Sequence, residues 1–357
     1  MMQRSIKYVN GQVFTGDEWM SQALITTQNG SIVSVAQNGP ADEVIDLKGG
    51  KLVPAFIDIQ LYGGNGMFFG EHPTVAALEV TVNYSRAGGA FLILPTVATN
   101  SNAVAFAAID AVKAYWAAGG KGVAGLHLEG PFLNTLKRGA HAADKIQEPT
   151  VENILKLVEY GKGVVKIMTI APELFTDEGI KILQESGIII SAGHSNATYE
   201  QANAAFGKGI GLATHLFNAM SPFQHRAPGL AGAILDHPSV MCSVVTDGYH
   251  VDAAAIRIAK KLMGERLFII TDAVTANTEG YYQHRLEGSR YVMPDGTLSG
   301  SALTMAKAVK FCVEQVGIAE SEALRMASLY PARALGQDML WGRIAPGYND
   351  ALFLMNQ

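Results

Sequence analysis

Two apolar runs near the middle of the chain, GIIISAGH and GIGLATH, end in His194 and His215. Runs of Val, Ile and Leu bounded by Gly are typical of buried parallel strands. Residues 196–208, between the runs, have the composition of a helix, and Ser195 or Asn196 is its expected N-cap. The segment therefore predicts a strand–helix–strand unit with one histidine at the carboxyl end of each strand. Two histidines placed in this way favour a metal site over two separate structural roles.

The same alternation of apolar strand and helix extends through most of the chain. Eight apolar runs alternate with helix-like segments across residues 51–272. This count favours a (β/α)8 barrel, with a doubly wound open sheet as the alternative. Residues 273–300 carry turn signals and predict a hairpin at the barrel mouth, whereas 302–316 and 321–329 predict helices that complete the ring.

The two ends of the chain differ from this alternating pattern. Residues 1–50 contain short strand candidates that are separated by Asn-Gly and Gly-Asp turns, and they predict a small β-layer. The C-terminal segment 342–357 again has the pattern of a strand, which we expect to join that layer.

Charge and composition disfavour several classes of function. The formal net charge is −5 without a block of like charges, so nothing indicates binding to nucleic acid or to a membrane surface. The N-terminus lacks a signal-peptide apolar region, and no apolar run approaches the roughly 20 residues of a membrane span. We therefore expect a cytoplasmic protein without disulfides, in which Cys242 and Cys312 are small buried residues.

Polar residues gather at the carboxyl ends of the predicted strands, where barrel active sites assemble. They are Asp58, Gln60, Glu129, His194, His215, Asp247 and Asp272. One Glu with two His is a catalytic zinc set that leaves a position for water, so we expect a metal at Glu129, His194 and His215. A carboxylate that is not a ligand can take and return a proton, and Asp272 is the candidate.

The remaining polar candidates have simpler interpretations. We interpret Asp247 as structural, and His127 as a core residue because it lies one layer deeper in its strand than Glu129. His72, His237 and His284 fall in predicted loops, where we expect them to be solvated.

Seven motifs resemble, in order, the family of N-acetylglucosamine-6-phosphate deacetylases in the amidohydrolase superfamily. The likeness runs from about residue 6 to about residue 350, and the motifs are highly specific as a set. The motifs are HLEGPFL (127–133), SAGHSNAT (191–198), THLFNAM (214–220), HRAPGLAGAILD (225–236), DGYHVD (247–252), TDA (271–273) and GTLSGSALTM (296–305).

The resemblance implies a barrel of residues 51–339 and a small β-sandwich domain of residues 1–50 plus 340–357. It also implies that the enzyme deacetylates an amino-sugar phosphate with one divalent metal ion per subunit, for which we expect zinc, with iron as the alternative. The expected partners are this small-molecule substrate and a second copy of the chain, in a homodimer.

The family pattern also assigns roles to individual residues. Glu129, His194 and His215 match the metal ligands, and Asp272 matches the general acid/base. His141 resembles the histidine that contacts the substrate and polarises the acetyl carbonyl. The other expected substrate contacts are Asn218 and Ala219 to the phosphate, His250 to the sugar phosphate, and Arg226 to the phosphate across the dimer interface.

One departure from the superfamily pattern limits the number of metals. The usual His-x-His after the first strand is replaced by Gln60-Leu61-Tyr62, and neither replacement is a good ligand for a second ion.

Three alternative functions remain open at this stage. A dihydropyrimidinase-like ring opener needs a lysine at the end of strand four, but Lys166 lies several residues before that end. Deacetylation of the galactosamine epimer is a second alternative that the sequence does not exclude. A scaffold protein without catalysis is disfavoured because the metal ligands and Asp272 are all present.

Overall fold

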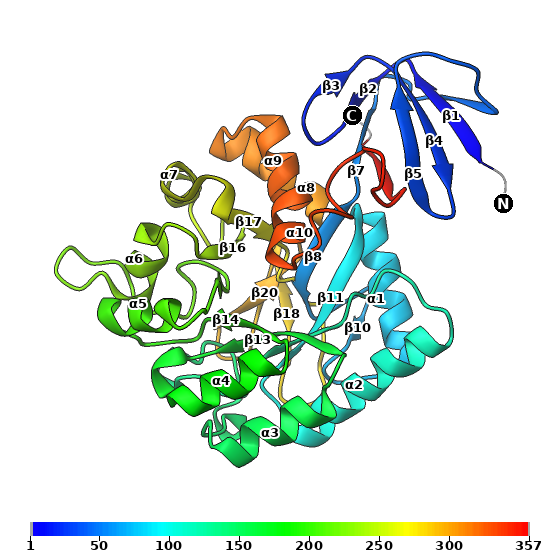
Figure 1. The fold of residues 1–357 in the computed structure, drawn as a ribbon. Helices are drawn as coiled ribbons and strands as arrows, with labels where there is room; N and C mark the ends of the chain where they lie inside the picture. Colours follow the sequence, from blue (N-terminus) through cyan, green and yellow to red (C-terminus); the bar gives the residue numbers. More distant parts are fainter. Residues whose placement is uncertain (1–2, 356–357) are drawn as a thin grey trace.

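The structure, a computed structural model, describes residues 3–355 of the 357-residue chain. Its central sheet has eight parallel strands in the order β17-β16-β15-β14-β13-β12-β11-β8, which confirms the predicted barrel (Figure 1). These strands are β8 (Phe56–Leu61), β11 (Ala90–Ala98), β12 (Leu126–Glu129), β13 (Val165–Ile170), β14 (Ile189–Ala192), β15 (Leu212–Ala213), β16 (Met241–Val245) and β17 (Leu267–Ile270).

Helices surround the barrel and bury their apolar faces against it (Figure 1). They are α1 (Val75–Ala87), α2 (Asn102–Ala117), α3 (Val151–Tyr160), α4 (Asp177–Glu185), α5 (Tyr199–Gly207), α6 (Gly229–Asp236), α7 (Ala253–Met263), α8 (Met305–Phe311), α9 (Glu320–Ala327) and α10 (Leu329–Ala334). A short π-helix, Cys312–Val316, extends α8. Short 3-10 helices span Thr135–Lys137, Ala143–Lys145, Pro172–Leu174 and Gly264–Arg266. Among the described residues, no helix is both long enough and apolar enough to cross a membrane.

The barrel is closed by hydrogen bonds between its first and last strands. Beyond β17, the amide of Asp272 donates to the Gln60 carbonyl at 3.0 Å, and the amide of Tyr62 donates to the Ala273 carbonyl at 2.8 Å. Deeper in the same seam, the buried Asp58 carboxylate accepts bonds from the amide and the hydroxyl of Thr271. Asp58 is therefore a bridge that holds β8 against β17.

Two four-stranded sheets form a smaller unit beside the barrel (Figure 1). One contains β5 (Ser31–Ala36), β4 (Ala23–Gln28), β1 (Arg4–Val9) and β6 (Glu43–Asp46), and the other contains β21 (Leu352–Met355), β7 (Lys51–Pro54), β2 (Gln12–Phe14) and β3 (Trp19–Met20). The C-terminal strand β21 pairs antiparallel with β7, so the two ends of the chain meet in one sheet. The exact domain division at residues 50 and 340 stays a prediction, and residues 1–2 and 356–357 lie outside the described range.

The first apolar run of the barrel is divided between these two units. The sequence LVPAFIDIQL reads as one strand, but β7 ends at Pro54 and joins the small sheet, whereas β8 begins at Phe56 and joins the barrel. Pro54 lacks an amide hydrogen, which suits a strand end rather than a strand interior.

The expected N-cap of α5 is wrong. Thr198, not Ser195 or Asn196, caps this helix, because its hydroxyl accepts from the Gln201 amide while the Gln201 side chain accepts from the Thr198 amide. The hydroxyl of Ser195 instead donates to Glu173 at 2.6 Å, in the loop that leads away from β14.

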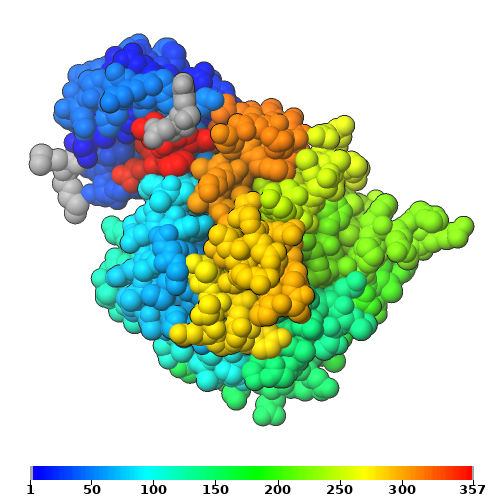
Figure 2. All heavy atoms as spheres, turned by 180° about the vertical axis from the view of Figure 1, so that it is seen from behind, coloured from blue at the N-terminus to red at the C-terminus, as the bar shows by residue number. Residues whose placement is uncertain are grey.

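The 273–300 insertion forms a small antiparallel sheet at the barrel mouth. It contains β18 (Arg285–Glu287), β19 (Arg290–Val292) and β20 (Leu298–Ser301), and Figure 2 shows this segment, in yellow, spread over one face of the barrel. A short hairpin of β9 (Gly63–Gly64) and β10 (Met67–Phe68) follows β8. The backbone amide of Ser301 joins β20 to the barrel by donating a hydrogen bond to the Asp272 carbonyl at 2.9 Å.

The buried Asp58 predicts a pH-dependent contribution to stability. Burial raises its pKa to about 7, despite the bonds from Thr271 and Gln60. The folded chain therefore holds this proton more tightly than the unfolded chain, and the wild type loses stability as pH rises from about 4 to about 7. Asp58→Asn keeps the shape and does not titrate. Its unfolding free energy relative to wild type should increase across that window by roughly 1 kcal/mol or more, measured by urea unfolding. A difference that is constant with pH would contradict this account.

Candidate metal centre

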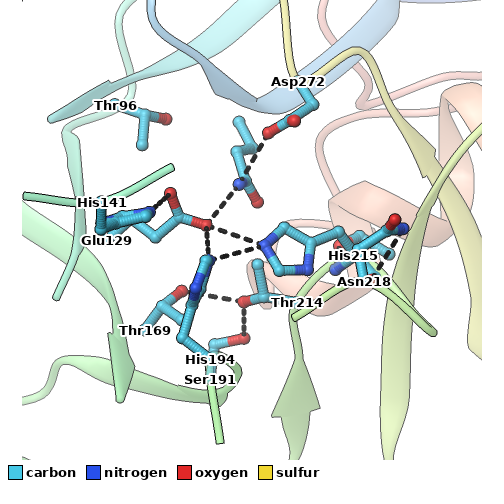
Figure 3. A network of polar contacts seen from close by, with 12 residues as sticks. Thr96, Glu129, His141, Thr169, Ser191, His194, Thr214, His215, Asn218 and Asp272 are labelled. Atoms are coloured by element: carbon cyan, nitrogen blue, oxygen red, sulfur yellow. Dashed lines mark hydrogen bonds and ion pairs between the residues drawn. The ribbon is translucent and has the colours of Figure 1, made fainter. Parts of the chain in front are cut away.

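A cavity of about 150 Å³ opens at the carboxyl ends of the barrel strands. Four predicted site residues from four different strand ends line it together: Glu129 after β12, His194 after β14, His215 after β15 and Asp272 after β17. All four side chains are buried. The structure therefore brings together residues that are up to 143 positions apart in the chain, as the parallel strands require (Figure 3).

Three atoms of this group converge on one point (Figure 3). Glu129 Oε1 lies 3.2 Å from His194 Nε2 and 3.0 Å from His215 Nε2, and the two Nε2 atoms are 3.0 Å apart. Ligands bonded to zinc at about 2.1 Å in a tetrahedral site lie roughly 3.4 Å from each other, so these separations suit one shared cation.

The hydrogen bond on the other ring nitrogen of His194 fixes its tautomer. His194 Nδ1 lies 2.9 Å from the Lys137 carbonyl oxygen, which can only accept, so Nδ1 carries the hydrogen. In the neutral ring, Nε2 then presents a lone pair towards Glu129 Oε1, which is itself an acceptor. Two acceptors that face each other in a buried site need a cation between them, and a backbone carbonyl on the far nitrogen is typical of metal-binding histidines.

His141 also lies close to Glu129 and His194, and its ligand atoms are within 4.8 Å of theirs, so a second possible triad exists. The tautomer argues against it. The Thr99 amide donates to His141 Nδ1 at 3.2 Å, so the hydrogen of the neutral ring is on Nε2, which donates to Glu129 Oε2 at 3.0 Å. His141 is therefore a hydrogen-bond donor in this site, and Glu129, His194 and His215 fit a metal better.

Gln60 and Tyr62 occupy the place of the superfamily's strand-one histidines. Gln60 Nε2 donates to Glu129 Oε1 at 2.9 Å and to Asp272 Oδ1 at 3.0 Å. The Tyr62 hydroxyl donates to Glu129 Oε2. Both side chains thus direct donor groups, and not metal-binding lone pairs, at the carboxylate beside which a second ion would lie.

Burial and neighbouring charges shift the pKa values of Glu129 and His194. Burial favours the neutral form of Glu129, but His141 and His194 outweigh burial and hold its pKa well below the usual range. Burial, with a contribution from His141, lowers the pKa of His194 to about 4. At neutral pH the carboxylate is therefore charged and this imidazole is neutral, which are the forms that bind metal.

The pKa of Asp272 is shifted in the opposite direction to that of Glu129. Burial, together with the charge of Glu129, raises the pKa of its carboxyl. A carboxylate with a raised pKa is better suited to take up a proton near neutral pH than an ordinary aspartate. His250 Nε2 lies 3.8 Å from Asp272 Oδ2. The other ring nitrogen, His250 Nδ1, lies 2.7 Å from Asp247 Oδ2. Asp247 thus orients His250, in agreement with the structural role predicted for it.

The backbone is unusual at three of these positions. His194, His215 and Asp272 adopt φ angles of 47°, 36° and 53°, in the left-handed region that residues with a side chain rarely occupy. Such conformations cost about 1–3 kcal/mol each and cluster at functional sites. Each lies where the chain leaves a barrel strand.

The residues expected to contact substrate are only partly in this cavity. His141, Asn218, Ala219 and His250 line it. Arg226 does not: it is exposed on the loop between β15 and α6, which protrudes from the barrel at the left of Figure 1. Lys166, the residue that a ring opener would need, also lies outside the cavity lining, in β13.

Sequence reasoning missed several residues in the cavity or directly behind its lining. Thr99 orients His141 through its backbone amide and its hydroxyl. It is a polar residue directly after the carboxyl end of β11, so the rule that identified Glu129 and His194 could also have identified Thr99. Tyr282 donates to the Thr99 carbonyl at 2.6 Å and lines the cavity, but nothing in the insertion sequence marks it. The expectation that His284 is solvated is wrong, because the insertion folds over the barrel mouth and buries it.

The chain is similar to a known protein family and to several known proteins. The model of the amidohydrolase family matches residues 52–356. The N-acetylglucosamine-6-phosphate deacetylase of Haemophilus influenzae is 38% identical over 339 residues, 91% of this chain and 88% of that protein. The N-acetylgalactosamine-6-phosphate deacetylase of Shewanella sp. is 36% identical over 84% of this chain and 78% of that protein. A crystal structure of N-acetylglucosamine-6-phosphate deacetylase from Pasteurella multocida has a TM-score of 0.93 and 34% identity, and covers 98% of this chain and 95% of that one.

The assignment of ligands predicts different metal contents for two variants. His194→Asn removes one of three converging ligand atoms, so the purified variant should lose most of its metal. Asp272→Asn leaves all three in place and should retain a wild-type metal content. Elemental analysis of both proteins after dialysis gives the comparison. If Asp272→Asn loses its metal as His194→Asn does, then Asp272 is a ligand and the division of roles is wrong.

Proposed function

The chain belongs to the amidohydrolase family, and from this premise we propose that it removes the acetyl group of N-acetyl-D-glucosamine 6-phosphate, giving glucosamine 6-phosphate and acetate. Extensive similarity to proteins with this named activity supports the substrate. The observation that carries the reaction type is the convergence of Glu129, His194 and His215 beside a carboxyl of raised pKa, Asp272. A metal-dependent amide hydrolase needs this combination of groups.

We place one divalent metal ion on Glu129 Oε1, His194 Nε2 and His215 Nε2. A metal held there lowers the pKa of a water ligand to roughly 7 and so supplies hydroxide at neutral pH. The mixed imidazole and carboxylate set favours zinc, although iron accepts the same ligands. Gln60 and Tyr62 support a single ion because both already donate to Glu129.

Asp272 moves the protons of the reaction in this proposal. It accepts a proton from the water that attacks the acetyl carbonyl, and it returns that proton to the nitrogen as the carbon–nitrogen bond breaks. The immediate products are the free amine and acetic acid, and at neutral pH the acid passes its proton to the amine or to solvent and becomes acetate, so the hydrolysis balances. Gln60 holds the carboxylate in position through its 3.0 Å bond to Oδ1.

His141 stabilises the oxygen on which negative charge develops. Its Nε2 carries a hydrogen because the Thr99 amide occupies Nδ1. This N–H is directed to Glu129 in the structure, beside the converging ligand atoms, and a carbonyl oxygen at this end of the cavity can share it. A donor that is already oriented in a buried site stabilises an oxyanion at little reorganisation cost.

The phosphate of the substrate is assigned to three residues of the same cavity. Asn218, Ala219 and His250 line the cavity and provide polar groups there. The Arg226 side chain does not line the cavity of its own chain, so a contact with phosphate requires a second copy. We therefore propose a homodimer in which each Arg226 reaches the substrate of the partner subunit.

The galactosamine epimer is the second candidate substrate. Relatives named N-acetylgalactosamine-6-phosphate deacetylase share 36% and 30% identity with this chain, over 84% and 94% of its length. The two substrates differ only in the orientation of one hydroxyl, so the same metal centre serves either. The cytoplasmic location expected from the sequence stays a prediction.

The reaction is tested by acetate release from N-acetylglucosamine 6-phosphate. Wild type should release acetate, and Asp272→Asn should reduce kcat by about 10²–10⁴, the range for loss of a positioned general acid or base. KM should change little, because proton transfer belongs to the transition state. No acetate from wild type would contradict the function. A normal rate in Asp272→Asn would contradict the role of Asp272 alone.

The phosphate role of Arg226 predicts a selective defect. Arg226→Ala should raise KM for the 6-phosphate by about 10-fold, because a hydrogen bond to a charged group contributes roughly 1.5–3 kcal/mol. The matched variant Arg226→Lys keeps the charge but not the bidentate geometry, so its KM should lie between those of Arg226→Ala and wild type. Turnover of the unphosphorylated sugar should be unaffected. Equal defects on both sugars would show that Arg226 is structural, and an active monomer would exclude the cross-subunit contact.

A further inference from the structure

Glu173 is an acidic residue near the metal centre that the proposed chemistry does not use. It lies in the 3-10 helix Pro172–Leu174, which follows β13, a strand that supplies no metal ligand. The residue is half-buried and does not line the cavity. Any effect of Glu173 on the reaction therefore passes through the residues that it contacts.

The Glu173 carboxylate joins two segments that lie about 60 positions apart in the chain. Its Oε1 accepts from the side-chain amide of Asn134 at 2.9 Å and from the backbone amide of Asn196 at 2.7 Å. Its Oε2 accepts from the hydroxyl of Ser195 at 2.6 Å. Hydrogen bonds to a charged acceptor are the stronger ones, so this carboxylate holds the loop after β12 firmly against the loop after β14.

The first of these loops contacts His194 at two points. The backbone amide of Asn134 donates to the His194 carbonyl at 2.9 Å, and the Lys137 carbonyl accepts from His194 Nδ1. Asn134 also fixes the turn between these contacts, because its side-chain oxygen accepts from the Leu136 amide at 3.0 Å and its carbonyl accepts from the Lys137 amide at 2.9 Å. The position of the Lys137 carbonyl therefore depends on Asn134, which Glu173 holds.

The second loop leaves His194 in an unfavourable backbone conformation. The φ angle of His194 is 47°, which a residue with a side chain keeps only where the surrounding structure holds it. Ser195 and Asn196 are the next two residues, and both donate to Glu173. Glu173 therefore supports the backbone directly after His194 as well as the turn that contacts its ring.

We propose that Glu173 is a positioning residue for the metal ligand His194. By joining the turn at residues 134–137 to residues 195–196, it keeps the Lys137 carbonyl on Nδ1 and so keeps the Nε2 lone pair directed at Glu129. This inference rests on the metal site of the proposed function. Groups that orient a metal-binding imidazole contribute about 10–100-fold to metal affinity or activity.

Three substitutions test the contacts separately. Glu173→Ala removes all three bonds. Glu173→Gln keeps an oxygen for Asn134 and Asn196, and its amide can donate to the Ser195 hydroxyl, so the geometry is retained without the charge. Asn134→Asp keeps the oxygen that accepts from the backbone of the turn, but it places a second carboxylate against Glu173 and so opposes the contact.

Glu322→Ala is the matched control. The Glu322 carboxylate on α9 is also half-buried, and it also accepts from three side chains: Lys260, Arg325 and Tyr330. None of these four residues lines the cavity. The control variant therefore loses a similar number of bonds without a change at the metal site.

The measurement is the zinc dissociation constant of each metal-stripped protein, by competition with a chromogenic chelator, together with the melting temperature of the metal-free protein. Glu173→Ala and Asn134→Asp should each bind zinc at least about 10-fold more weakly than wild type. Glu173→Gln should recover most of the loss seen in Glu173→Ala. Glu322→Ala should melt at a lower temperature than wild type and bind zinc equally well.

Three results would overturn the inference: wild-type zinc affinity in Glu173→Ala or in Asn134→Asp, no recovery in Glu173→Gln, or an equal loss of affinity in Glu322→Ala. If Glu173→Ala does not fold, Asn134→Asp decides, because it truncates no side chain. Failure of the proposed function is distinct from these results, because wild type itself would then bind no zinc or release no acetate.

Discussion

The carboxylate of Glu129 is the group on which the barrel mouth depends. It is a buried anion, and such a charge is tolerated only where donors or cations surround it. Two neutral donors, Gln60 and Tyr62, reach it from β8, and His141 reaches it from the loop beyond β12. Its Oε1 remains directed at the two imidazoles that follow β14 and β15. Oε2 therefore accepts from Tyr62 and His141, whereas Oε1 accepts from Gln60 and also faces the two imidazoles, where it suits a metal.

This division explains why five polar groups within hydrogen-bond distance of one carboxylate have different roles. The tautomers are set by groups outside the cavity: the Lys137 carbonyl leaves a lone pair on His194 Nε2, and the Thr99 amide leaves a hydrogen on His141 Nε2. Gln60 adds a second constraint, because it also holds Asp272. Gln60, which replaces one of the superfamily's strand-one histidines, therefore holds the proposed base, Asp272, beside the proposed ligand, Glu129.

Much of the fold and of the candidate site could be predicted from the sequence, because the parallel strands of a barrel end at one face. Strand periodicity alone placed Glu129, His194 and Asp272 at that face. The pattern could not reveal that β7 leaves the barrel, since an apolar run does not show which sheet a strand joins. It also could not place His284, because the insertion has weak periodicity and this residue is buried by the tertiary fold and not by a local pattern.

The central claim is that one metal ion on these three ligands carries the deacetylation. The most direct test is to remove the bound metal with a chelator and add zinc in steps below and above one equivalent per chain. Acetate release from N-acetylglucosamine 6-phosphate is measured at each step. Activity should rise linearly and stop rising at one equivalent. A rise that continues to two equivalents, or activity that persists in the metal-free protein, would contradict it.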